Sequence, residues 1–156
     1  MVPILAYNLG AKKRSRLVKT IKLAIGYAVA IMLMGFVVFQ IIPDKILLLF
    51  NASPEMLTIG VAALRIISIS YLFAGFCVVA GSVFQALGNG MYSLIVSLAR
   101  QIGVLLPAAY LLARTGLVNM VWWAIPIAEI ASVTFSIIFM KRIYDQEIRP
   151  LPNYEF

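Results

Sequence analysis

The sequence contains no histidine and only one cysteine, Cys77. It therefore offers no pair of thiols for an intrachain disulfide and no cluster of metal-ligating side chains, so we expect neither a metal site nor a bound cofactor. It also shows no nucleophile beside a base and no phosphate-binding loop. We expect that the chain is not an enzyme.

Charged residues are scarce as well, at 12% of 156 residues against about 25% in soluble domains. Hydrophobic residues make up 63%, and the mean hydropathy is +0.99. A chain of this composition lacks the polar surface of a soluble globule, so we predict an all-α integral membrane protein that contacts the lipid bilayer. We attribute the net charge of +7 to basic residues beside membrane spans and not to a nucleic-acid surface. No nucleic-acid partner is expected.

Long apolar runs indicate where the chain crosses the membrane. Because a helix rises about 1.5 Å per residue and the hydrocarbon core is about 30 Å thick, a crossing needs about 20 apolar residues. Four runs meet this requirement and together form one expected membrane domain, residues 23–140. The predicted crossings are residues 23–42, 66–87, 91–113 and 117–140.

The segments around these crossings are more polar. Residues 1–22 carry six Lys and Arg side chains with apolar residues interleaved at helical spacing, so we expect a basic amphipathic lead-in at the lipid headgroups. Ser53 and Pro54 form a helix start, from which nothing in the sequence stops the helix before Gly88. Residues 141–156 form an expected polar tail.

Four crossings place both ends of the chain on the same side of the membrane. That side would carry nine Lys and Arg residues, whereas the opposite side would carry only Lys45, Arg65 and Arg114. Cytoplasmic segments of membrane proteins carry the excess of Lys and Arg. We therefore expect a multi-pass protein of the cell membrane with both termini in the cytoplasm.

Two charged residues fall inside the predicted crossings. Glu129 is the only ionisable side chain in residues 117–140, and a carboxylate in hydrocarbon must be protonated or paired. Arg100 cannot lie in a loop, because residues 102–113 alone would be too short to cross. The two lie at similar depths in antiparallel neighbours, which predicts an internal ion pair. The alternative for Arg100 is an extended side chain that reaches the headgroups.

Other residues of these two crossings are candidates for binding or bending. Gln101 joins Arg100 and Glu129 as a candidate for contact with a substrate or a coupling ion. Gly103, Pro107 and Pro126 are candidate hinges, because proline removes a helical hydrogen bond; the alternative is a fixed bend that only serves packing. A stripe of small residues every four positions predicts close helix packing. The stripe is Ala124, Ala128, Ser132 and Ser136.

Four segments resemble, in order, the C-terminal part of multidrug and toxic compound extrusion (MATE) transporters. They are PILAYNLGAKK at residues 3–13, FQALGNG at 84–90, SLARQ at 97–101 followed by Leu106-Pro107, and WAIPIAE at 123–129. The resemblance implies part of one lobe of a twelve-helix, two-lobed transporter, with the four predicted crossings similar to spans 9 to 12. It also implies exchange of organic cations or other amphiphiles for protons or sodium ions. The partners would be small organic substrates and the N-terminal spans of the same transporter.

The chain departs from that family in two respects. It lacks what would be the first eight spans, including the N-terminal lobe where many members keep a proton-coupling aspartate. Sodium-coupled members often carry an acidic residue in the span that corresponds to residues 66–87, and this segment has none.

Other functions also remain open. One alternative to a transporter is a stand-alone four-span membrane scaffold that oligomerises through its small-residue stripes. Another is a fragment of a lipid-linked-precursor flippase, which shares the wider architecture.

Overall fold

The computed structural model describes residues 1–152, and in this range it contains helices and no strands. The first half consists of α1 (Val2–Gly10), α2 (Arg14–Ile41), α3 (Pro43–Leu49), α4 (Pro54–Ser68) and α5 (Tyr71–Ala86). The second half consists of α6 (Gly90–Leu98), the π-helix η1 (Ala99–Leu105), α7 (Leu106–Ala113), α8 (Val118–Val121), α9 (Ala124–Ile143) and the π-helix η2 (Tyr144–Ile148). The predicted all-α fold class is confirmed.

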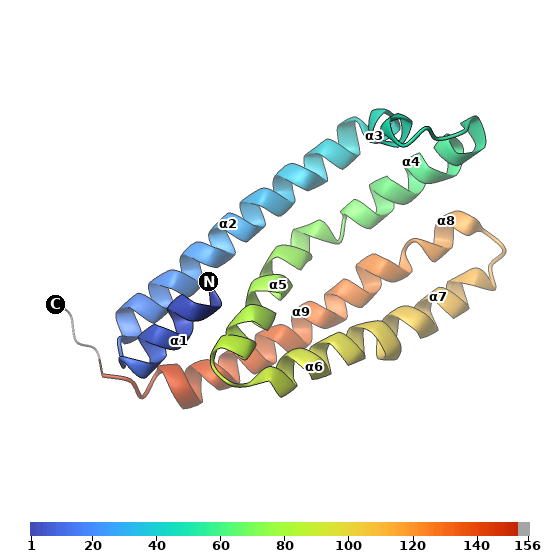
Figure 1. The fold of residues 1–156 in the computed structure, drawn as a ribbon. Helices are drawn as coiled ribbons and strands as arrows, with labels where there is room; N and C mark the ends of the chain where they lie inside the picture. The colour runs from blue at the N-terminus through green and yellow to red at the C-terminus, as the bar shows by residue number, and fades with distance from the viewer. Residues whose placement is uncertain (153–156) are drawn as a thin grey trace.

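Three of these helical stretches are long and apolar enough to cross a membrane, and a bent pair of helices makes a fourth candidate. The three are Arg14–Ile41, Gly90–Ala113 and Val118–Ile148, and the bent pair is α4 with α5. Figure 1 shows these four stretches running side by side along the length of the molecule. The chain is therefore a multi-pass membrane protein.

The basic lead-in differs from the expected separate segment. Its second part, residues 14–22, is the first part of α2, and α1 packs back against α2 and α5. Leu17 and Ile21 are buried together with Leu5 of α1 in an apolar core. The helix is continuous because these apolar side chains, one turn apart, have a protein surface to pack against.

The helix expected to run uninterrupted from Pro54 to Gly88 is bent by 55° between α4 and α5. The Ser68 and Ser70 hydroxyls donate to the carbonyls of Arg65 (2.9 Å) and Ile67 (2.6 Å), three residues back. Such bonds compete with the regular helical pattern. Gln40 of α2 stabilises the bend by donating to the Arg65 carbonyl at 3.0 Å and to the Ser68 hydroxyl at 3.1 Å. The predicted crossing 66–87 is thus the second limb of a bent span.

α5 lies between α2 and α9, and the α6–η1–α7 stretch packs along α9 (Figure 1). Gly75 permits the approach of α5 to α2: a Cβ atom at this position would lie 3.1 Å from the carbonyl carbon and oxygen of Ala28. At the other end of α5, Phe84 is completely buried against Tyr92 and Phe139. This packing fixes α5, α6 and α9 around the site described next.

The C-terminal segment also differs from the expected tail. α9 continues beyond residue 140 to Ile143 and is extended by η2 to Ile148, because Ile143 and Ile148 are buried in the apolar core. Arg14, at the start of α2, donates to the Tyr144 hydroxyl at 3.2 Å. The beginning of α2 and the end of α9 therefore meet at one end of the molecule. Residues 153–156 of the expected tail lie outside the described residues.

Candidate functional site

Arg100 lies in η1, the wide turn between α6 and α7. Pro107 follows two residues after this turn and has no backbone N–H to give to the preceding helix. Instead of a simple kink, the chain adopts π-helical bonding, in which the Leu106 N–H donates to the Gln101 carbonyl five residues back. π-Helical segments inside α-helices are rare and are frequent at functional sites.

Glu129 lies in the first half of α9, which begins at Ala124 after a break at Trp122 and Trp123. Pro126 is in the first turn of α9, where a missing N–H costs little, so it marks the start of the helix and does not bend its interior. The Trp122 carbonyl that a residue at position 126 would normally pair accepts from the Ile125 N–H at 3.3 Å. The break between α8 and α9 was not predicted.

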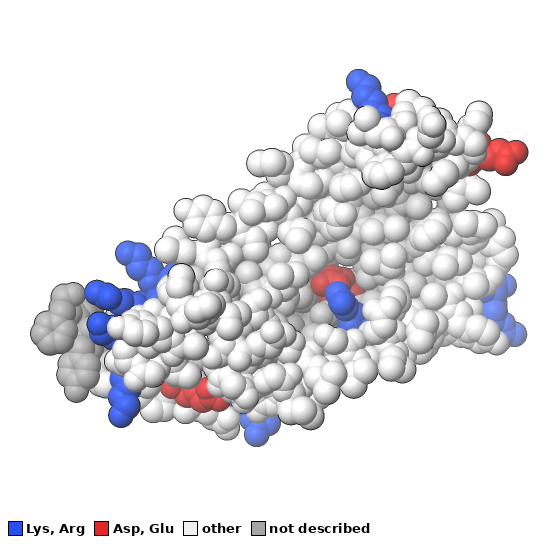
Figure 2. All heavy atoms as spheres, viewed as in Figure 1, with Lys and Arg blue, Asp and Glu red and all other residues white. Residues whose placement is uncertain are grey.

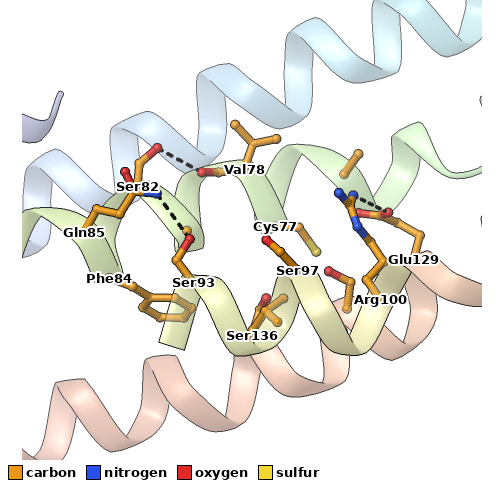
Figure 3. Close-up of a pocket in the computed structure, with 14 residues that line it drawn as sticks. Cys77, Val78, Ser82, Phe84, Gln85, Ser93, Ser97, Arg100, Glu129 and Ser136 are labelled. Atoms are coloured by element: carbon orange, nitrogen blue, oxygen red, sulfur yellow. Dashed lines mark hydrogen bonds and ion pairs between the residues drawn. The ribbon is translucent and has the colours of Figure 1, made fainter. Parts of the chain in front are cut away.

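The predicted ion pair is present. Arg100 Nη1 lies 3.3 Å from Glu129 Oε2, with 42% of the arginine side chain and 6% of the glutamate side chain exposed. Figure 3 shows the two side chains pointing toward one another from neighbouring helices. In the low-dielectric interior of a membrane protein, pairing offsets part of the free-energy cost of burying the carboxylate.

The pair lies at one end of a hollow of about 230 Å³ between α5, α6, η1 and α9. Polar side chains line much of this hollow (Figure 3). They are Cys77, Ser82, Gln85, Ser93, Ser97, Arg100, Glu129, Ser132 and Ser136. A polar hollow of this size inside a membrane-spanning fold has room for several water molecules or a small ligand.

Two buried oxygens of the hollow have no hydrogen-bond partner within the described part of the chain. They are Glu129 Oε1, the oxygen that Arg100 does not contact, and the Ser136 hydroxyl. Buried polar atoms are nearly always paired in folded proteins. The site therefore has unused capacity to accept a hydrogen bond from water or a protonated amine, or to bind a cation.

Charge is arranged unevenly over the molecule. Figure 2 shows one contact between a positive and a negative group in the middle of an otherwise uncharged face, while the remaining visible charges gather at the ends. In the described range, no group of three or more His, Cys, Asp or Glu side chains could hold a metal ion. The hollow thus carries one carboxylate and one guanidinium as its charged groups.

The structure brings together only part of the predicted site. Arg100 and Glu129 meet, but Gln101 is exposed and does not line the hollow. Gly103 has open space around its Cα, and Pro107 is exposed on α7. Neither residue lines the hollow, although both belong to the irregular part of the span that carries Arg100.

The serines and Cys77 of the hollow were not predicted as site residues. The stripe of small residues on α9 is buried as expected, but its two serines also line the hollow. The signal in the sequence was the seven-residue spacing of Glu129 and Ser136, which places both on nearly the same side of a helix. The contributions of α5 and α6 could not be read from spacing, because they depend on tertiary packing.

Comparisons with known proteins agree on one family. The MatE family model matches residues 1–111. Among solved structures, the chain is similar to the MATE multidrug transporter DinF-BH, with a TM-score of 0.84 and 34% sequence identity. The match covers 95% of this chain and 33% of that protein. No curated protein sequence matches the chain.

The chain thus spans about a third of the length of the transporter that it resembles. Three findings agree with one another: the match to the family model, the helical membrane fold, and the structural similarity over nearly the whole chain. The chain belongs to the MATE family of transporters.

Proposed function

We propose that the chain is the C-terminal portion of a secondary active multidrug exporter. The complete transporter would exchange organic cations or other amphiphiles for protons or sodium ions across the cell membrane. Membership of the MATE family and the similarity to about a third of a multidrug transporter support this proposal. The observation that carries it furthest is the Arg100–Glu129 pair in a polar hollow inside the membrane domain.

In this proposal, Glu129 is the binding group and Arg100 is its exchangeable partner. The carboxylate is nearly completely buried and retains one oxygen without a partner among the described residues. The arginine is partly exposed, and its long side chain can move toward the headgroups while its stem stays in apolar surroundings. A proton, a sodium ion or a cationic substrate could then replace the guanidinium, because a buried carboxylate requires a positive partner.

The proposed partners are the N-terminal spans of the same transporter and the lipid bilayer. α2 and the α6–η1–α7 stretch are largely exposed in the chain by itself. Only 6% of the most apolar 18-residue stretch of each is buried. Alternating access requires two bundles that move about a central site. We therefore propose that the chain alone does not transport, and that both of its termini face the cytoplasm in the assembled protein.

The test is efflux of a fluorescent organic cation by the transporter with its N-terminal spans restored. Glu129→Gln should reduce ion-driven efflux at least tenfold, because the amide is neutral at every stage of the cycle. Arg114→Gln, which removes an exposed arginine at the end of a span, is the matched control and should leave efflux within twofold. Normal efflux by the Glu129→Gln variant would contradict the assignment of this site.

A further inference from the structure

A second hollow lies at the end of the molecule where α2 begins and α9 ends. It has a volume of about 460 Å³ and is lined by Arg14, Lys19 and Lys22 of α2 and by Tyr144 of η2, with Ser15, Val18 and Leu23. The Arg14 guanidinium donates to the Tyr144 hydroxyl at 3.2 Å. Three cationic side chains thus converge on one concave surface beside two hydroxyl groups.

The hollow lies where the polar start of α2 meets its apolar length. From Leu23 the helix carries no charged residue, and the next one in the chain is Asp44. Lipid headgroups occupy this boundary in a bilayer. Basic pockets at this level bind the phosphates of anionic lipids.

An apolar groove continues from the same place toward the middle of the membrane domain. It has a volume of about 370 Å³ and is lined by Phe76 of α5 with Ile137, Met140, Lys141 and Tyr144. Tyr144 lines both the hollow and the groove, so the two adjoin. Ile137 precedes Tyr144 by seven residues, which corresponds to about 10 Å along a helix axis.

We propose that these two surfaces form a binding site for an anionic phospholipid. The phosphate would lie among Arg14, Lys19 and Lys22, and an acyl chain would follow the groove past Tyr144 to Ile137. The positive hollow complements the charge of the headgroup, and the adjoining apolar groove distinguishes a lipid from a free phosphate ion. This site is separate from the Arg100–Glu129 hollow and does not depend on the transport activity.

The test measures lipid binding to the purified full chain in detergent, by native mass spectrometry with phosphatidylglycerol and phosphatidylcholine. Phosphatidylglycerol should bind at least tenfold more tightly. The Lys19→Gln/Lys22→Gln variant should lose most of this preference, since each surface cation contributes roughly fivefold. The matched control, Lys12→Gln/Arg16→Gln, removes two charges at the same end that do not line the hollow, and it should retain the preference.

The groove is tested by filling it. Ile137 and Ile138 are neighbours with similar exposed fractions, 53% and 55%, but only Ile137 lines the groove. Ile137→Trp should weaken phosphatidylglycerol binding severalfold, whereas Ile138→Trp should not. Circular dichroism of each variant verifies that helical content is unchanged.

Three results would overturn the proposal. Equal losses in the two charge variants would mean that the basic end attracts anionic lipids only diffusely. Glycerol phosphate competing as strongly as the lipid would mean a site for a free phosphate group. Equal effects of the two tryptophan variants would mean that the groove holds no acyl chain.

Discussion

At the scale of single residues, the stability of the site depends on two oppositely charged side chains that are buried to different extents. Glu129 is nearly inaccessible, while Arg100 remains partly exposed. Removing the arginine would leave a buried carboxylate alone, whereas removing the glutamate would leave a guanidinium that can turn toward water or headgroups. The pair is therefore expected to respond asymmetrically to substitution.

Arg100→Gln should destabilise the purified chain by about 2 kcal/mol, and Glu129→Gln by less. The double variant should be more stable than Arg100→Gln, because no buried charge is left unpaired. A double-mutant cycle read as thermal stability in detergent should give a coupling of about 1 kcal/mol or more. Additive effects within error would show that the two side chains do not interact. The control is Arg114→Gln, which measures the effect of losing an exposed arginine.

The sequence was sufficient to predict this pair but not the hollow around it. Depth along two antiparallel helices placed Arg100 beside Glu129, since a helix has a fixed rise per residue. Gln101 was also predicted as a site residue, but it is exposed in the π-helical segment, where five-residue bonding changes the directions of neighbouring side chains. Cys77 and Ser93 reach the hollow through packing between helices that are distant in sequence.

At the scale of helices, the fold depends on close approach of α5 to its neighbours. A methyl group on Gly75 would meet the Ala28 backbone at 3.1 Å, and backbone cannot move aside as a flexible side chain can. Gly26, on α2, has no atom within 4 Å of the corresponding position. The two glycines therefore make a matched pair for testing this packing.

Gly75→Ala should lower the stability by about 1–2 kcal/mol, because overpacking costs more than the gain in helix propensity. Gly26→Ala should be neutral or stabilising by up to about 1 kcal/mol, since it gains propensity without a clash. Thermal unfolding in detergent measures both. If the Gly75→Ala variant were as stable as the Gly26→Ala variant, the result would contradict the close contact between α5 and α2.

The all-α membrane fold followed from the long apolar runs and the polar residues between them, but the irregularities of the helices did not. The bend after Ser68 is stabilised by Gln40 from another helix, so no local pattern could predict it.

The bend is expected to be a place of weaker local stability. Gln40→Leu should therefore increase hydrogen exchange of residues 66–72 several-fold, whereas Gln101→Leu, at an exposed position, should not. Equal protection in both variants would remove Gln40 from this role.

At the scale of the whole molecule, the distribution of charge predicts orientation. Nine Lys and Arg residues belong to the segments before the first crossing and after the last one, against three on the opposite side. Cysteines introduced at Ser15 and Asn51, in a Cys77→Ala background, should therefore differ in their reaction with an impermeant thiol reagent added outside cells. Position 51 should be labelled and position 15 protected. The reverse pattern would refute the proposed orientation.

The most direct test of the central claim is a comparison of efflux with and without the rest of the transporter. Proteoliposomes containing only this chain should show no ion-driven efflux of a fluorescent organic cation, because one bundle cannot alternate access by itself. Addition of the N-terminal spans should produce efflux that depends on the ion gradient and is lost in Glu129→Gln. Robust gradient-driven efflux by the chain alone would contradict the account, as would failure of the assembled wild-type transporter to move any organic cation or amphiphile.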